Sequence, residues 1–150
     1  MGGVVLATRQ TGSAWSGRRA NLLGMPPRRR TPVAEGRAAL EVCRGAGWAA
    51  DRRTTGTAVR YTLDELATTA PGRTVEVRVP PHGAVQCIEG PVHTRGTPPN
   101  VIETDGATWL RLAVGELTWE EALAGALVRA SGQRAHLDGL LPLDSLNLDG

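Results

Sequence analysis

The chain of 150 residues is long enough for one domain that buries about 68–70% of the surface its unfolded chain exposes. Its 17 basic residues against 15 acidic ones give a net charge of +2, and the positive charge lies mainly in residues 1–60. Because the rest of the chain is acidic, one uniformly basic surface is disfavoured, and we expect no specific nucleic-acid partner.

The number of cysteines and the length of the apolar segments indicate in which cellular compartment the protein works. The two cysteines, Cys43 and Cys87, are too few for a disulfide framework, and their separation matches no paired zinc-ligand spacing. No apolar run reaches the roughly 18 residues of a membrane span, and Val4–Ala7 is too short for the apolar region of a signal peptide. We therefore expect a cytoplasmic protein without metal or cofactor that makes at most transient membrane contact.

Residues 1–30 contain many Arg, no acidic residue and no apolar period, which predicts a disordered tail. Met25 opens the run MPPRRR, so one hypothesis is that the native protein begins there and that residues 1–24 are an upstream extension. The run Arg28–Arg30 suits an anionic membrane or nucleic acid, but a solvated charge run is the interpretation we favour. Residues 31–143 are predicted to be the folded domain, and residues 144–150 are predicted to fray.

Two helices are predicted in the first half of the domain. Thr31 as N-cap and Pro32 at the first helical position predict a helix that ends near Arg44, before a glycine. Residues 49–56 are rich in Arg and Thr and are predicted to be a loop. From Ala58 to Ala70, apolar residues recur at three- and four-residue steps, which predicts a second helix ended by Pro-Gly.

The pattern then changes to that of strands. Thr74–Val79 alternates valine with polar residues, and Ala84–Glu89 returns after the turn PPHG, which predicts an antiparallel hairpin. A loop over residues 90–99, with a short strand suggested at Val92–Thr94, precedes another predicted strand at Asn100–Glu103.

The last third of the chain again carries helix signals. Asp105 is predicted to cap a helix that ends at Gly115, and Thr118 with Glu121 forms a capping-box pattern before the next helix. The apolar face of that next helix is predicted to consist of Trp119, Ala122, Leu123, Ala126 and Leu127. A strand at Leu127–Ser131 and a last helix at Arg134–Leu141 complete an α+β pattern with helices packed on a sheet.

The central motifs resemble a known family. The segment GAVQCIEGP at 83–91, followed by HTRGTPPN at 93–100, resembles the bacterial sterol-carrier-protein-like family of actinobacteria. TWL at 108–110, TW at 118–119 and SG at 131–132 are similar to the end of sterol carrier domains, and the resemblance extends over Thr31–Leu143. It implies a single domain with a mostly antiparallel sheet covered by helices and an apolar tunnel for a fatty acyl, sterol or other lipid-like ligand.

This resemblance and the periodic pattern suggest which residues meet such a ligand. Each buried CH₂ of a ligand chain contributes about 0.8 kcal/mol. The candidate wall residues are Val75, Val77, Val79, Val85, Trp109, Leu112, Trp119, Leu123 and Leu127. Ordinary core packing is the alternative for each of them, and at any single position it is the interpretation we favour. Arg95 is the candidate for an anionic head group, with a structural pairing to Glu89 or Glu103 as the alternative.

A reactive or metal site is the competing class. His82, Cys87, Glu89 and His93 lie close in sequence, but they match no established metal motif, and a Cys–His pair lacks a third member. We therefore favour a structural cysteine and expect no enzyme activity. The predicted function is reversible sequestration of a hydrophobic small molecule or lipid. The alternative is a protein-interaction module with the same fold, no ligand and an unidentified partner.

Overall fold

The computed structural model describes residues 28–92, 94–96 and 99–147. Residues 1–27 of the predicted disordered tail over residues 1–30, and with them the hypothetical start at Met25, lie outside the described residues. Within the described residues, every helix is too short or too polar to span a bilayer.

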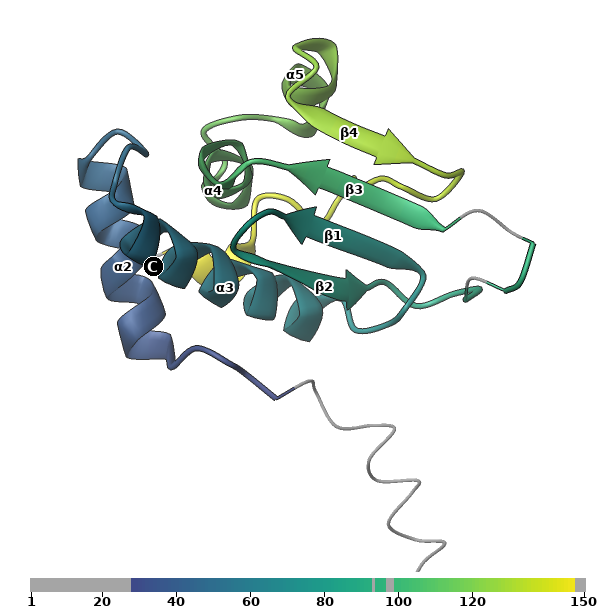
Figure 1. Ribbon diagram of the computed structural model, residues 1–150, viewed down its shortest axis with the longest axis horizontal. Helices are drawn as coiled ribbons and strands as arrows, with labels where there is room; N and C mark the ends of the chain where they lie inside the picture. The colour runs from purple at the N-terminus through teal and green to yellow at the C-terminus, as the bar shows by residue number, and fades with distance from the viewer. Residues whose placement is uncertain (1–27, 93, 97–98, 148–150) are drawn as a thin grey trace, which may run out of the picture.

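A four-stranded mixed sheet forms one layer of the molecule (Figure 1). Its strands, in the spatial order β2-β1-β3-β4, are β1 (Val75–Val79), β2 (Gly83–Cys87), β3 (Asn100–Thr104) and β4 (Val128–Ser131). β1 runs antiparallel to β2 and parallel to β3, and β3 runs antiparallel to β4. The predicted α+β domain with a mostly antiparallel sheet is therefore confirmed.

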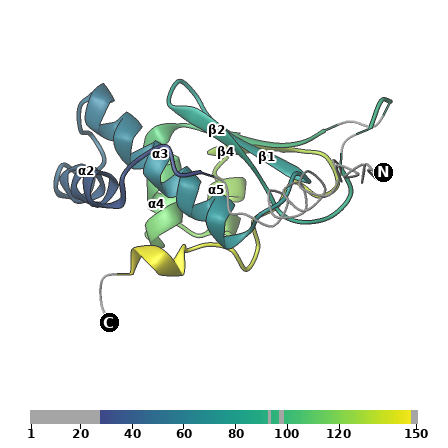
Figure 2. The same ribbon diagram turned by 90° about the horizontal axis from the view of Figure 1, so that it is seen from below.

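The helices lie on one face of this sheet, as the view from below shows (Figure 2). They are α2 (Val33–Gly45), α3 (Arg52–Thr69), α4 (Gly106–Val114), α5 (Trp119–Ala124) and a short 3₁₀ helix, η1 (Asp144–Leu146). Val75, Val77 and Val79 of β1 point toward the helices and are buried, whereas Arg78 is exposed on the opposite face. The alternation in β1 therefore decides which face of the sheet carries the core.

α2 begins at Val33, later than predicted. Pro32 is the N-cap and makes no side-chain cap bond, while the backbone N–H of Thr31 points to the Asp64 carboxylate of α3 at 3.2 Å. Thr31 therefore joins two helices instead of capping one. α2 packs on α3, where Gly36 leaves room for the Tyr61 ring.

The predicted loop at residues 49–56 is wrong, because α3 begins at Arg52. The Asp51 carboxylate caps the helix by accepting the Thr54 backbone N–H at 2.9 Å and its hydroxyl at 2.7 Å. The hydroxyls of Thr57 and Thr62 donate to carbonyls four residues earlier, at 3.1 and 2.9 Å. Polar threonines are thus accommodated in this helix, whose first turns the apolar pattern did not predict.

The hairpin is confirmed, with small differences at its ends. β2 ends at Cys87, two residues earlier than predicted, because Ile88 adopts a left-handed φ of 68°. The strand suggested around residues 92–94 is wrong for Val92 and Thr94, and His93 lies outside the described residues.

Two corrections concern the C-terminal part. α5 ends at Ala124, and its predicted apolar face does not continue: Leu123 and Leu127 are 43% and 41% exposed. The helix predicted at Arg134–Leu141 is wrong, because Gly132 and Gly139, with φ of 102° and 75°, leave only turns there. We call residues 132–143 the strap.

Candidate functional site

Most of the residues predicted to line a tunnel lie in the close-packed core. Val77 and Val79 are 0% exposed, and Val75 is 1% exposed. Trp109 is also 0% exposed, and its indole N–H donates to the Thr62 hydroxyl at 2.8 Å, which fixes the ring between α4 and α3.

The other predicted wall residues divide by position. Leu112 and Trp119 are buried, and Val85 is partly buried against the core. Leu123 and Leu127 lie on the surface beside β4. The structure thus brings the strand valines, Trp109 and Leu112 together in one apolar cluster and leaves two leucines outside it.

The strap completes the apolar layer on the helical side of the sheet (Figure 2). Leu137 and Leu143 of the strap are each 1% exposed and belong to the same cluster as the strand valines. The strap is held at one end by the Leu143 backbone N–H, which donates to the Ala113 carbonyl at 2.9 Å. At the other end the Arg134 N–H donates to the Asn100 side-chain oxygen at 3.0 Å.

Two hollows flank the strap. The first, of about 450 Å³, lies between the end of α3 and the strap and is lined by Thr69, Ala70, Pro71, Ile88, Glu89, His136, Asp138 and Leu140. The second, of about 240 Å³, is lined by Gly115, Leu117, Thr118, Trp119, Glu120, Leu137, Asp138, Gly139, Leu141 and Pro142. Trp119 is therefore the one predicted wall residue that lines either of these two hollows.

A wider and more polar hollow of about 1200 Å³ separates the start of the described chain from the β2 edge. Here Arg29 forms an ion pair with the buried Glu65, and the Arg30 backbone N–H donates to Asp64 at 2.8 Å. These arginines, which the sequence placed in the tail, are thus bound to α3.

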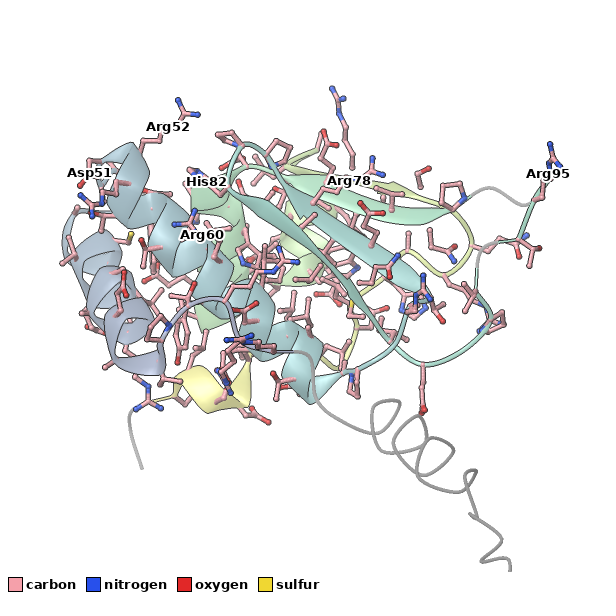
Figure 3. The ribbon with its side chains drawn as sticks, turned by 60° about the horizontal axis from the view of Figure 1, so that its bottom comes forward. Asp51, Arg52, Arg60, Arg78, His82 and Arg95 are labelled. Atoms are coloured by element: carbon pink, nitrogen blue, oxygen red, sulfur yellow. The ribbon has the colours of Figure 1, made fainter. Side chains whose placement is uncertain are left out.

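A fourth region combines two adjoining hollows of about 510 and 460 Å³, where the β1–β2 turn meets the first turns of α3 and α4. We call it the arginine hollow. Its lining residues are Trp48, Ala50, Arg52, Arg53, Thr55, Arg60, Pro81, His82 and Gly106. Figure 3 shows Arg52, Arg60 and His82 at the same end of the molecule.

Charge dominates the arginine hollow. Partial burial, then the nearby charges of Arg60 and Arg52, lower the pKa of His82, so its neutral form is favoured. The carboxylate of Asp51, the residue before Arg52, caps α3, and hydrogen bonds from Thr54 lower the pKa of this carboxyl group. Arg52 and Arg60 form no ion pair with any described residue.

Arg95 lies far from this region. It is exposed on the loop after β2, at the opposite end of the molecule from Arg52 and Arg60 (Figure 3). It pairs with neither Glu89 nor Glu103 within the described part of the chain, and it lines none of the hollows above. Its predicted contact with an anionic head group stays a prediction.

Burial makes the Cys87 thiol unreactive. Cys87 is 0% exposed, and desolvation raises the pKa of its thiol to about 12, which keeps it neutral at physiological pH. Among the described residues there is no group of three or more His, Cys, Asp and Glu side chains that could hold a metal ion.

Sequence reasoning missed the arginine hollow for a definable reason. The pattern of residues 49–56 predicts a loop, which separates Arg52 and Arg53 from the helix that contains Arg60. The Asp51–Thr54 pair is a cap signal that could have moved the helix start. His82 lines the hollow only because the β1–β2 turn packs against α3 and α4. No pattern in the neighbouring sequence predicts this packing.

Residues 51–143, more than half of the chain, match a family model described as "Bacterial SCP ortholog". The match begins at Asp51, the α3 cap, and therefore contains the sheet, α3, α4, α5 and the strap, but not α2. No curated protein matches the chain.

Proposed function

Because this chain belongs to a bacterial sterol-carrier-protein-like family, we propose that it binds a lipid-like molecule by reversible sequestration and catalyses no reaction. The family prediction made from the motifs at 83–100 is confirmed, although the match starts at Asp51 and not at Thr31. Family membership is the observation that carries this proposal.

The ligand space that we propose lies between the sheet and the strap. The apolar face of β1 and the strap leucines Leu137 and Leu143 belong to one buried cluster. An apolar chain that replaced these leucines would bury its CH₂ groups against the same valines, at about 0.8 kcal/mol for each group. The strap contains no regular helix or strand, so its displacement breaks few backbone hydrogen bonds.

The hollows on both sides of the strap support this location. Ile88 and Leu140 line one of them, and Leu117, Trp119 and Leu141 line the other. The first, of about 450 Å³, lies within the range of roughly 300–1,000 Å³ for small-molecule sites, and the second, of about 240 Å³, lies below it. A ligand could therefore begin to bind at the surface before the strap moves.

The absence of catalysis is part of the proposal. The buried, neutral Cys87 thiol is unsuited to nucleophilic attack, which supports a binding role. The proposed cycle is thus binding, transport and release of an unchanged ligand.

Fluorescence titration with cis-parinaric acid tests the proposal. Leu143→Ala removes a strap side chain from the core, so the ligand has less protein to displace, and we expect binding about tenfold tighter than wild type, equal to about 1.4 kcal/mol. Leu40→Ala in α2 truncates a leucine that is also buried, but it lies outside the strap and should leave the affinity unchanged. No binding by the wild type, or equal effects of the two variants, would contradict the proposal.

One observation favours a second candidate, a ligand-free docking module. Among the described residues, no helix covers the outer face of the sheet, where Arg78, Glu103 and Arg129 stand side by side on β1, β3 and β4. Charge reversal at Arg78 and Arg129 distinguishes the two roles. In a carrier, charge reversal should leave cis-parinaric acid binding unchanged. In a ligand-free docking module, the wild type should bind no cis-parinaric acid, and charge reversal should weaken docking.

A further inference from the structure

The arginine hollow lies outside the proposed lipid space and has its own chemistry. Arg60 and His82 converge on the position where Gly56 has no side chain. A Cβ placed there would lie 2.9 Å from Arg60 Nη1 and 3.1 Å from His82 Nδ1. Arg52 lines both halves of the hollow together with His82. Arg60 and His82 therefore meet at one point of the hollow, and Arg52 lines the same hollow.

These arginines differ from others in the molecule. Arg29, Arg44 and Arg78 each form an ion pair with a glutamate. By contrast, Arg52, Arg53 and Arg60 make no ion pair within the part of the chain that the structure describes. Such crowding of like charges raises the free energy of the folded state unless an anion reduces it.

The neighbouring carboxylates form no ion pair with these arginines. Asp51 accepts two hydrogen bonds from Thr54, and Asp105 accepts the Thr108 backbone N–H at 2.9 Å and its hydroxyl at 2.7 Å. Each aspartate therefore caps its own helix, α3 or α4. Two guanidinium groups and an imidazole remain directed at solvent in a concave site.

The other wall of the hollow is apolar. Trp48 and Pro81 line it with Ala50, and the Trp48 indole N–H donates to the Glu116 carboxylate at 2.6 Å, which fixes the ring. Gly106 lets the His82 ring approach α4, since a Cβ there would lie 3.2 Å from His82 Cδ2. The site thus offers an aromatic surface beside a cationic one.

We propose that the arginine hollow binds a small organic molecule that ends in an oxyanion, either a carboxylate or a phosphate monoester. Arg52, Arg60 and His82 hold the oxyanion, and the apolar part of the molecule lies against Trp48. Planar guanidinium groups suit both oxyanions, because they donate paired hydrogen bonds. This site is separate from the lipid space, so neither proposal depends on the other.

Isothermal titration with phenyl phosphate, benzoate and benzyl alcohol tests the proposal on the full chain. The two anions share a ring with the neutral alcohol, so we expect at least one anion to bind and the alcohol not to bind. Whether phenyl phosphate or benzoate binds more tightly identifies the source of the oxyanion. Equal binding of all three probes, or no binding of either anion, would overturn the proposal.

Variants locate the binding. Arg52→Gln and Arg60→Gln should each weaken binding of the preferred anion by at least about tenfold, as expected for a lost charged hydrogen bond. Arg129→Gln removes an exposed arginine on β4 and should leave the affinity unchanged. In ¹H–¹⁵N spectra, the Trp48 indole signal should shift with the anion. Equal affinity losses in all three variants would show only nonspecific charge attraction and would overturn the site.

Discussion

Two glycines lie inside helices, and the structure gives a different reason for the absence of a side chain at each. Gly36 of α2 faces the Tyr61 ring so closely that an added Cβ would lie 2.2 Å from ring carbon Cγ. Gly56 of α3 instead faces the tips of Arg60 and His82, which can move. Glycine normally weakens a helix interior, so each position retains it for what the missing side chain allows.

We expect Gly36→Ala to destabilise the protein by about 1–3 kcal/mol, because the methyl group must push the buried Tyr61 ring or separate α2 from α3. Urea denaturation gives the free energy of unfolding. The exposed Ala34→Gly provides a helix-propensity control, with an expected loss of about 1 kcal/mol or less. Unchanged stability of Gly36→Ala would show that the helices pack differently.

For Gly56→Ala, we expect unfolding stability to be kept or raised by up to about 1 kcal/mol through better helix propensity. The new methyl group meets Arg60 Nη1 at 2.9 Å and His82 Nδ1 at 3.1 Å, so the end of the Arg60 side chain must shift and the His82 ring must move by a few tenths of an ångström. Binding of phenyl phosphate or benzoate should therefore weaken. A variant that is both fully folded and fully competent in anion binding would refute this arrangement.

His82 makes a small, testable contribution to the pH dependence of stability. Its folded-state pKa is lowered, first by partial burial and then by Arg60 and Arg52, so the unfolded chain takes up a proton at higher pH than the folded one. Stability should consequently fall as the pH drops below 6.5, toward the folded pKa. The pH profile of unfolding for His82→Gln should be flatter in that range. Identical profiles would contradict the lowered pKa.

Among the secondary-structure elements, the start of α3 and the strap are the two segments that the sequence pattern predicted wrongly. The apolar period from Ala58 predicted the second half of α3 well, but its first turns are held by the Asp51 cap and by threonine hydroxyls. The strap carries leucines at spacings typical of a helix. Gly132 and Gly139 adopt positive φ and the leucines pack individually from turns, which a period cannot reveal.

Removal of the α3 cap should have a measurable cost. Asp51→Ala is expected to lower the free energy of unfolding by about 0.5–2 kcal/mol, because the Thr54 N–H and hydroxyl lose their acceptor. Asp51→Asn keeps an oxygen acceptor and should retain most of the stability. The comparison is made by thermal or urea unfolding. Equal losses in both variants would attribute the effect to charge and not to the cap.

For the molecule as a whole, the sequence correctly predicted helices packed on a sheet and the face of the sheet that is buried. The evidence was the alternation of valines in β1, the hairpin and the capping box. The motif at 83–91 led to the right family. The candidate sites depend on long-range packing: the Arg52, Arg60 and His82 group forms only when the hairpin turn reaches α3 and α4. The Leu137 and Leu143 side chains reach the core only through the turns of the strap.

The central claim is that a lipid-like chain can occupy the space between the sheet and the strap. Intermolecular nuclear Overhauser effects between decan-1-ol and methyl-labelled protein test it most directly, because this neutral probe has no oxyanion for the arginine hollow. We predict contacts from the alkyl chain to the methyl groups of Leu137, Leu143 and Val77. Contacts confined to surface leucines such as Leu123, or no contacts at saturating probe, would contradict the account.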